Sequence, residues 1–144
     1  MKLFGKSESV PTEGYKVLKS ETEWREELSP EQFKIMFEHA TERPGTSPLL
    51  QEKRTGTFVC AACGAPAYEA STKFESGTGW PSFWAPIADA TATTTDRAYF
   101  MVRTEVHCAN CGAHQGHVFD DGPAPTGLRY CMDGVSLKFV QRAA

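Results

Sequence analysis

The cysteines of this sequence fall into two groups that suit two kinds of chemistry. Four of the five form two Cys-x-x-Cys pairs, each followed by a glycine: Cys60 with Cys63, and Cys108 with Cys111. Two such turns supply four thiolates, which is the closed tetrahedral ligand set of a structural zinc site. Because protein ligands fill all four positions, none is left for a reactive water. We therefore predict one structural zinc ion per chain, bound by these four cysteines.

The spacing of the two pairs bears on the alternatives to this prediction. The pairs lie much farther apart than the roughly 15–20 residues found in a small zinc finger, so the ion would join two distant segments. Iron also binds four thiolates. Unligated buried thiols and redox-active pairs are two further interpretations, although a redox pair usually occurs once, at the start of a helix.

The fifth cysteine, Cys131, lies in a short strand-like segment with charged neighbours. On a strand, Arg129, Cys131 and Asp133 share one face, while Tyr130 and Met132 share the other. A guanidinium beside a thiol favours the thiolate, which is the nucleophilic form. A lone cysteine is often a small core residue instead, but the polar residues on its own face favour a reactive thiol.

Three of the four histidines, His107, His114 and His117, lie close to the second cysteine pair. Imidazole is the usual general acid near neutral pH. Because the cysteines already complete the metal coordination, His114 and His117 are candidates for catalysis rather than for metal binding.

A glycine-rich segment at residues 77–84 is the third unusual feature. Glycines flank Thr78, and three aromatic residues follow it: Trp80, Phe83 and Trp84. Such rings either belong to the core or line a pocket for a small apolar group.

Two helices and several strands must position these residues. Ser20 with Glu23 forms a capping box that begins a helix ending near residue 28, and Ser29 followed by Pro30 begins a second. The second helix has an apolar face with the spacing i, i+3, i+4 and i+7, formed by Phe33, Met36, Phe37 and Ala40. Residues 41–50 are rich in turn formers and are predicted to be an extended connection.

Beyond residue 50 the pattern changes to short strands broken by Gly, Pro and Asp. The strand-like segments are 55–61, 65–70, 98–109, 117–120 and 128–140. Because no long helix separates them, we expect antiparallel sheets. The predicted fold is mainly β, with antiparallel sheets packed as a small β domain, short N-terminal helices and a structural zinc site. Residues 1–19 are expected to be a polar N-terminal arm, and residues 20–141 the domain.

Composition limits the class of protein. The chain has 144 residues, 40% of them hydrophobic, a formal net charge of −3 and a pI of about 5.8. The acidic balance argues against a nucleic-acid binder. No apolar run reaches the roughly 18 residues needed to cross a membrane, and the N-terminus lacks the apolar stretch of a signal peptide. We expect a cytoplasmic protein with no nucleic-acid or membrane partner, whose cysteines are not a disulfide framework.

Taken together, these segments resemble the B-type methionine sulfoxide reductases, which act on the R epimer of methionine sulfoxide. The similarity covers roughly residues 20–141, with the motifs in the family's order, and leaves residues 1–19 outside. The motifs are Thr41-Glu-Arg-Pro44, the two cysteine pairs, Gly79-Trp-Pro-Ser-Phe83, His114-Gln-Gly-His-Val-Phe119, Asp121-Gly-Pro123, Arg129-Tyr-Cys131 and Ser136-Leu-Lys-Phe139. The family fold, with zinc far from the reactive thiol, agrees with the fold predicted above.

The resemblance implies a role for each candidate residue. Cys131 attacks the sulfoxide sulfur and becomes a sulfenic acid as methionine leaves, while Arg129 tunes its thiol. His114 and His117 protonate or polarise the sulfoxide oxygen or position water. Trp80 holds the terminal methyl group of the substrate. The other residues expected to bind substrate are Phe119, Asp121 and Asp133. The substrate is methionine-R-sulfoxide, free or within oxidised proteins and peptides.

Two positions depart from the family pattern. Thr78 stands where many members carry a resolving cysteine, so no free thiol remains to pair with Cys131. We therefore expect an external reductant: thioredoxin, glutaredoxin or a small thiol. Asp133 stands where the family usually has Asn, and a carboxylate there would raise the pKa of the Cys131 thiol. We expect Asp133 either to pair with Arg129 or to turn away.

Two other functions remain open at this point. A zinc-ribbon-like β domain would bind a peptide without catalysis, but it has no need of Cys131 beside two histidines. A cysteine hydrolase with a Cys-His pair would form an acyl-enzyme. Turnover of methionine sulfoxide with a thiol reductant separates a reductase from both, and we expect the reductase to be a monomer.

Overall fold

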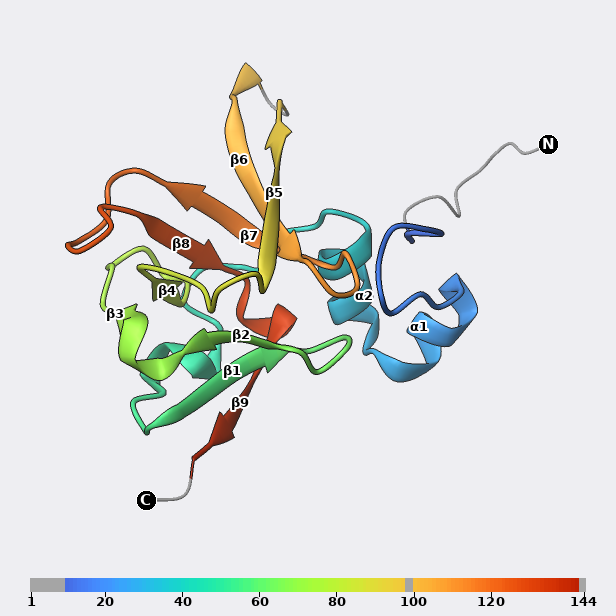
Figure 1. Ribbon diagram of the computed structural model, residues 1–144, viewed down its shortest axis with the longest axis horizontal. Coiled ribbons are helices and arrows are strands. Elements are labelled where there is room, and N and C mark those ends of the chain that lie inside the picture. The colour runs from blue at the N-terminus through green and yellow to red at the C-terminus, as the bar shows by residue number, and fades with distance from the viewer. Residues whose placement is uncertain (1–9, 98–99, 143–144) are drawn as a thin grey trace.

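The computed structural model describes residues 10–97 and 100–142, which form two antiparallel sheets with two α-helices at one end (Figure 1). The helices are α1 (Glu21–Glu27) and α2 (Pro30–Phe37). The three-stranded sheet has the order β2 (Pro66–Glu69), β1 (Gly56–Cys60) and β9 (Leu137–Gln141). The six-stranded sheet has the order β3 (Lys73–Phe74), β4 (Ser82–Phe83), β8 (Arg129–Met132), β7 (His114–Phe119), β6 (Arg103–Cys108) and β5 (Thr91–Asp96). The predicted fold class is confirmed.

Both α-helices begin where the sequence predicts, but the second ends early. Ser20 and Ser29 each form a complete capping box with the residue three positions on. The α2 helix ends at Phe37, and two residues later His39 has a positive φ of 60° that turns the chain away. Ala40, predicted as the last residue of the apolar face, therefore lies outside the helix.

The strand predicted at 98–109 is shorter than expected. It begins at Arg103, while Met101 and Val102 before it are exposed and residues 98–99 lie outside the described part of the chain. The sequence analysis also did not predict β5. That strand is mostly threonine and mostly exposed, so its apolar pattern is weak, and its hydrogen bonds to β6 define it.

The single strand predicted at 128–140 is two separate strands in the structure. A 3₁₀ turn at Gly134–Ser136 divides it into β8 of the six-stranded sheet and β9 of the other sheet. The strand predicted at 117–120 also begins earlier, at His114, because β6 continues alongside it. Further 3₁₀ turns occur at Pro48–Gln51 and Ala70–Thr72.

Two hydrophobic clusters hold these elements together. The first lies between the sheets, and its largest members are Phe58, Tyr68, Phe83 and Met132. The second joins both helices to the cysteine pairs, and it includes Trp24, Phe33, Phe37, Cys60, Cys108 and Cys111. The helices therefore pack against the predicted metal site rather than against the middle of a sheet.

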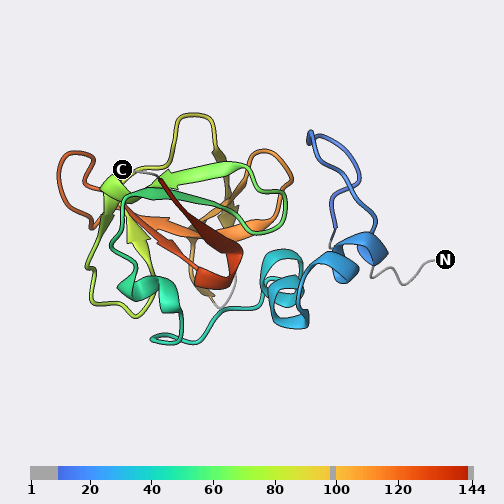
Figure 2. The same cartoon turned by 90° about the horizontal axis from the view of Figure 1, so that it is seen from below.

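The described part of the N-terminal segment, residues 10–19, lies against the second cysteine pair. Val10 is buried in the helix-side cluster, and the backbone N–H of Val17 donates to the carbonyl of Asn110 at 3.0 Å. The ring of Tyr15 lies over Gly112, so closely that a Cβ there would meet it at 2.8 Å. Figures 1 and 2 both show this segment beside the helices. Polar composition alone gave no indication of these contacts.

Strand register brings the candidate site together on one face of the larger sheet. Across β6, β7 and β8, Glu105 lies opposite His117, which lies opposite Cys131. Because paired residues in antiparallel strands point to the same face, these three side chains share one surface. Within the described residues, no helix is long and apolar enough to span a membrane.

Candidate active site

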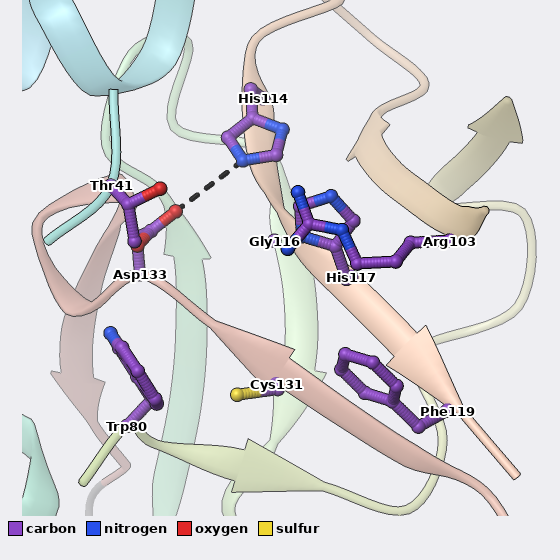
Figure 3. A pocket seen from close by; sticks show the side chains of 9 residues that line it. All are labelled: Thr41, Trp80, Arg103, His114, Gly116, His117, Phe119, Cys131 and Asp133. Carbon is purple, nitrogen blue, oxygen red and sulfur yellow. Dashed lines mark ion pairs between the residues drawn. The ribbon is translucent and has the colours of Figure 1, made fainter. Parts of the chain in front are cut away.

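Cys131 lies in β8 between β4 and β7 and borders a small cavity. The cavity has a volume of about 110 Å³, and nine residues line it: Thr41, Trp80, Arg103, His114, Gly116, His117, Phe119, Cys131 and Asp133 (Figure 3). On the other face of β8, Met132 is buried and Tyr130 packs against the core between the sheets. The predicted division of this segment into two faces is confirmed, with Cys131 toward the cavity and Met132 toward the core.

The Cys131 thiol is protonated at rest. Burial raises its pKa, and the charge of Asp133 adds to this effect. The charge of Arg129 and a hydrogen bond with Thr78 act in the opposite direction, but the pKa stays above its usual value. Arg129 is itself engaged by Asp121, with Nε to Oδ1 at 2.8 Å and Nη2 to Oδ2 at 3.0 Å. Arg129 favours the thiolate as predicted, but it does not outweigh burial.

His114 is held between two carboxylates. Its Nδ1 donates to Glu105 Oε2 at 2.8 Å, and its Nε2 lies 3.4 Å from Asp133 Oδ2. Burial alone would lower the pKa of His114, but the two carboxylates outweigh burial and raise that pKa to about 9. The side chain is therefore an imidazolium at neutral pH, although only 7% of its surface is exposed.

Glu105 supports His114 from behind, and the sequence analysis did not identify it. Its carboxylate accepts hydrogen bonds from His107 Nδ1 at 2.9 Å and from the Thr94 hydroxyl at 2.9 Å, besides that from His114. Burial alone would raise the pKa of Glu105, but these donors hold it well below its usual range. Glu105 belongs to the site because it lies in register with His117 on the neighbouring strand, and local periodicity in the sequence does not reveal strand register.

His117 has a different environment, although it is on the same strand. Its Nε2 lies 2.9 Å from Asp96 Oδ2, and Asp96 also accepts from Arg103 Nη2 at 3.1 Å. Burial lowers the pKa of His117, and the hydrogen bond to Asp96 only partly offsets that effect. The two histidines predicted to act together therefore differ in charge at neutral pH.

Asp133 turns toward His114 and not toward Arg129, so the second of the two expected arrangements, in which Asp133 turns away from Arg129, is the one observed. Arg129 lies four residues earlier in the chain, and its guanidinium faces Asp121. Asp133 Oδ1 instead accepts the backbone N–H of Glu42 at 3.1 Å. This bond fixes the carboxylate beside the His114 ring (Figure 3).

Glu42 is a second buried acid that the sequence analysis left unassigned. Its carboxylate accepts the backbone N–H groups of Gly134 and Val135, each at 2.9 Å. Its own carbonyl accepts the indole N–H of Trp80 at 3.0 Å. One residue thus fixes the Trp80 ring, the Asp133 carboxylate and the turn after β8. The segment 41–50, predicted only as a connection, contributes directly to the cavity wall.

The predicted substrate-binding residues are not all at the cavity. Trp80, Phe119 and Asp133 line it, together with both catalytic histidine candidates. Asp121 is 62% exposed and does not line the cavity, and neither does its partner Arg129. The Arg129 guanidinium lies over the Phe119 ring at 4.4 Å from its centroid. Arg129 and its partner Asp121 therefore lie behind Phe119, which itself lines the cavity.

The four paired cysteines meet in space and fit a metal ion. Their sulfur atoms all lie within 4.8 Å of one another, with Cys60 to Cys111 and Cys63 to Cys108 both at 3.7 Å. A tetrahedral zinc ion with Zn–S bonds of about 2.3 Å requires sulfur separations of roughly 3.8 Å. Asn110 donates from its backbone to Cys108 and from its side chain to Cys63, both at 3.3 Å, as suits thiolate acceptors. None of the four cysteines lines the cavity.

The chain is similar to one group of proteins over most of its length. The SelR domain matches residues 28–141. A protein of Agrobacterium fabrum named peptide methionine sulfoxide reductase MsrB is 52% identical over 125 residues, covering 86% of this chain and 93% of the relative. Relatives of the same name in Leptospira interrogans and Methanosarcina barkeri are 50% and 52% identical. They cover 87% and 85% of this chain, and 96% and 87% of their own length.

The contacts of His114 predict how stability depends on pH. The folded-state pKa, about 9, exceeds the ordinary value of 6.5. The stabilisation from this histidine is therefore complete below about pH 6.5 and is lost as pH rises towards 9. Over that interval we expect the free energy of unfolding to fall by up to about 3 kcal/mol.

The substitution Asp133→Asn keeps an acceptor for the backbone N–H of Glu42 but removes one carboxylate from His114. The pKa of His114 should therefore fall, and the loss of unfolding free energy between about pH 6.5 and 9 should become smaller. Imidazole NMR titration and urea unfolding at several pH values measure both effects. Asp120→Asn, on an exposed residue without contact to His114, is the control. An unchanged His114 titration in Asp133→Asn would contradict the pairing.

Proposed function

Because this chain belongs to the SelR family of MsrB-type methionine sulfoxide reductases, we propose that it reduces the R epimer of methionine sulfoxide with Cys131 as nucleophile. The observation that carries the proposal is the small cavity where the Cys131 thiol, two histidines of different charge and an indole ring converge. We assign this function to residues 20–141, with residues 1–19 as an N-terminal arm.

The proposed reaction transfers the sulfoxide oxygen to the cysteine. The Cys131 sulfur bonds to the sulfoxide sulfur, and the protonated oxygen leaves as water when the S–O bond breaks. That water then attacks the Cys131 sulfur and breaks the new S–S bond, so that methionine leaves and Cys131 becomes a sulfenic acid. The thiol must lose its proton and the oxygen must be protonated, since a sulfoxide oxygen is otherwise a poor leaving group. Thiol and sulfoxide thus become sulfenic acid and thioether with no further reactant.

The two histidines suit different parts of this step. His114 is a cation at neutral pH, and a fixed positive charge stabilises the negative charge that develops on the sulfoxide oxygen. His117 has a lowered pKa and lies opposite Cys131 on the neighbouring strand. We assign His117 the transfer of the thiol proton to the oxygen, because a neutral imidazole can first accept a proton and then donate it.

Selection of one sulfoxide epimer follows from the different chemistry of the two sides of the cavity. The ring of Trp80, fixed by its bond to Glu42, and the ring of Phe119 provide apolar contacts for the terminal methyl group. The two histidines lie across from Trp80 in Figure 3. Only one epimer can direct its methyl group to the indole and its oxygen to the histidines at the same time.

Regeneration is assigned to an external thiol. Thr78, which hydrogen-bonds to Cys131, occupies the position of the family's resolving cysteine, and the other four cysteines gather at the metal-type cluster. A reductant thiol therefore attacks the sulfenic acid, releases water and leaves a mixed disulfide, which a second thiol reduces. Thioredoxin, glutaredoxin or a small thiol would serve.

The cysteine cluster is assigned one zinc ion with a structural role. Four thiolates at tetrahedral spacing match zinc, and they leave no open position for substrate. Bound zinc would join the turn after β1 to the turn between β6 and β7. The cysteines share a hydrophobic cluster with Trp24 and Phe33, so they would also support the docking of both helices.

Turnover of separated sulfoxide epimers tests the proposed reaction. With dithiothreitol as reductant, we expect reduction of methionine-R-sulfoxide and none of the S epimer, because only one epimer can satisfy both sides of the cavity and the family resemblance implies that it is R. Cys131→Ser should lower turnover by at least about a thousandfold while zinc content and the unfolding midpoint stay unchanged. Activity on the S epimer alone would contradict the assignment.

The proposed regeneration by an external thiol predicts that Thr78→Cys forms an internal disulfide with Cys131, which the parent chain cannot form. In the parent chain, one turnover without reductant should leave a Cys131 sulfenic acid that a dicarbonyl reagent labels, as mass spectrometry can measure. In Thr78→Cys the new thiol lies beside Cys131, so an internal disulfide should replace the label. Thr93→Cys, on the exposed face of β5, is the matched control and should retain the label. A quantitative internal disulfide in the parent chain, with zinc released, would overturn this route.

Metal content tests the assignment of the cluster. The purified chain should contain one zinc, and Cys111→Ser should lose most of it, whereas Cys131→Ser should retain it. Loss of zinc should lower the free energy of unfolding by about 5 kcal/mol or more and change the fluorescence of buried Trp24, because the helices pack on these cysteines. Atomic emission and urea unfolding measure the two quantities. Full zinc occupancy in Cys111→Ser would contradict the ligand set.

A further inference from the structure

A second, larger cavity adjoins the one beside Cys131. Its volume is about 520 Å³, and it shares four lining residues with the smaller cavity: Thr41, Arg103, His114 and His117. Its remaining wall is largely polar, with hydroxyl and carboxylate groups from β5 and β6 and an apolar border from the end of α2. The smaller cavity has room for little more than a methyl sulfoxide group. The adjoining cavity is large enough to hold the rest of a bound substrate.

Arg103 lies at the junction of the two cavities and has unused hydrogen-bond donors. Its Nη2 donates to Asp96 at 3.1 Å, and within the described residues this is its one hydrogen bond. Among residues 10–97 and 100–142, its buried Nε has no hydrogen-bond partner. Figure 3 shows the guanidinium extending across His117 toward the middle of the cavity wall. The Nη groups keep donors beyond the one given to Asp96, and an oxygen acceptor in the cavity could pair with these donors of a partly buried cation.

We propose that Arg103 binds the main-chain oxygen of the methionine sulfoxide residue, and that the larger cavity holds the main chain beside it. This inference rests on the proposed function, since it places the substrate's sulfoxide group next to Cys131. The acceptor is a carboxylate in the free amino acid and a carbonyl in a peptide. Both are oxygens that a guanidinium binds with charge-assisted hydrogen bonds.

A test must separate this contact from the effect of Arg103 on His117. Burial is the main cause of the lowered pKa of His117, but the charge of Arg103 adds to it, so any substitution also changes the histidine. Ethyl methyl sulfoxide has the reacting group of methionine sulfoxide and no main chain. It therefore reports the effect through His117 alone, and the difference between substrates reports main-chain binding.

The experiment compares three substrates in the zinc-loaded full chain: ethyl methyl sulfoxide, free methionine-R-sulfoxide and N-acetyl-methionine-R-sulfoxide methylamide. In Arg103→Met we expect KM for the two amino-acid substrates to rise about tenfold, with kcat/KM for ethyl methyl sulfoxide changed less than threefold. A larger rise for the free amino acid identifies a carboxylate as the better ligand, and a larger rise for the capped form identifies a peptide carbonyl. Arg103→Lys, which keeps the charge, should give an intermediate KM.

Controls distinguish this contact from general damage. Arg142→Met, at an exposed arginine paired with Glu69, should leave all three substrates unchanged. Equal losses for all three substrates in Arg103→Met, or no loss for any, would overturn the proposal. If Arg103→Met does not fold, an unchanged KM in Arg103→Lys would also overturn it. Failure of the parent chain on every sulfoxide would instead defeat the proposed function, and this inference with it.

Discussion

Three buried carboxylates, Glu42, Glu105 and Asp133, impose the constraint on which the site depends. A carboxylate removed from water must be satisfied by donors around it. Glu42 takes two backbone N–H groups after β8, Asp133 takes the N–H of Glu42, and Glu105 takes two histidines and a threonine. Each of these bonds fixes a separate chain segment. The cavity wall therefore consists of the segment after α2, β6, β7 and the end of β8. The buried acids hold these segments together, because water cannot replace their hydrogen-bond donors.

The cysteine cluster and the cavity are connected through the same two strands. The second cysteine pair forms the turn between β6 and β7, and those strands carry Glu105, His114 and His117 toward Cys131. The helices pack on the cysteines at this end, and the chain leaves α2 directly into Thr41 and Glu42. The cysteine cluster therefore lies at one end of the segments that form both sides of the cavity, although none of the four cysteines lines the cavity.

The parts of the structure that could be predicted from the sequence were those defined over a few residues. Capping boxes, paired cysteines and the two faces around Cys131 depend on local spacing, and each was confirmed. Glu42, Glu105 and Arg103 went unassigned because isolated charged residues in short segments resemble solvent-exposed ones. What buries them is strand register and the return of the chain after α2. Whether Asp133 pairs with Arg129 or turns away was left open for the same reason, since its contact with His114 depends on where β7 lies.

A repair enzyme for oxidised methionine works while oxidants are abundant, and its own nucleophile is exposed to them. Peroxides react with thiolates far more readily than with thiols. The half-buried Cys131, with its raised pKa, is a thiol between turnovers and becomes a thiolate only as the proposed reaction proceeds. The same burial that slows the resting nucleophile therefore protects it from irreversible overoxidation. In this chain that protection matters more than usual, because no neighbouring cysteine can capture the sulfenic acid as a disulfide before it is oxidised further.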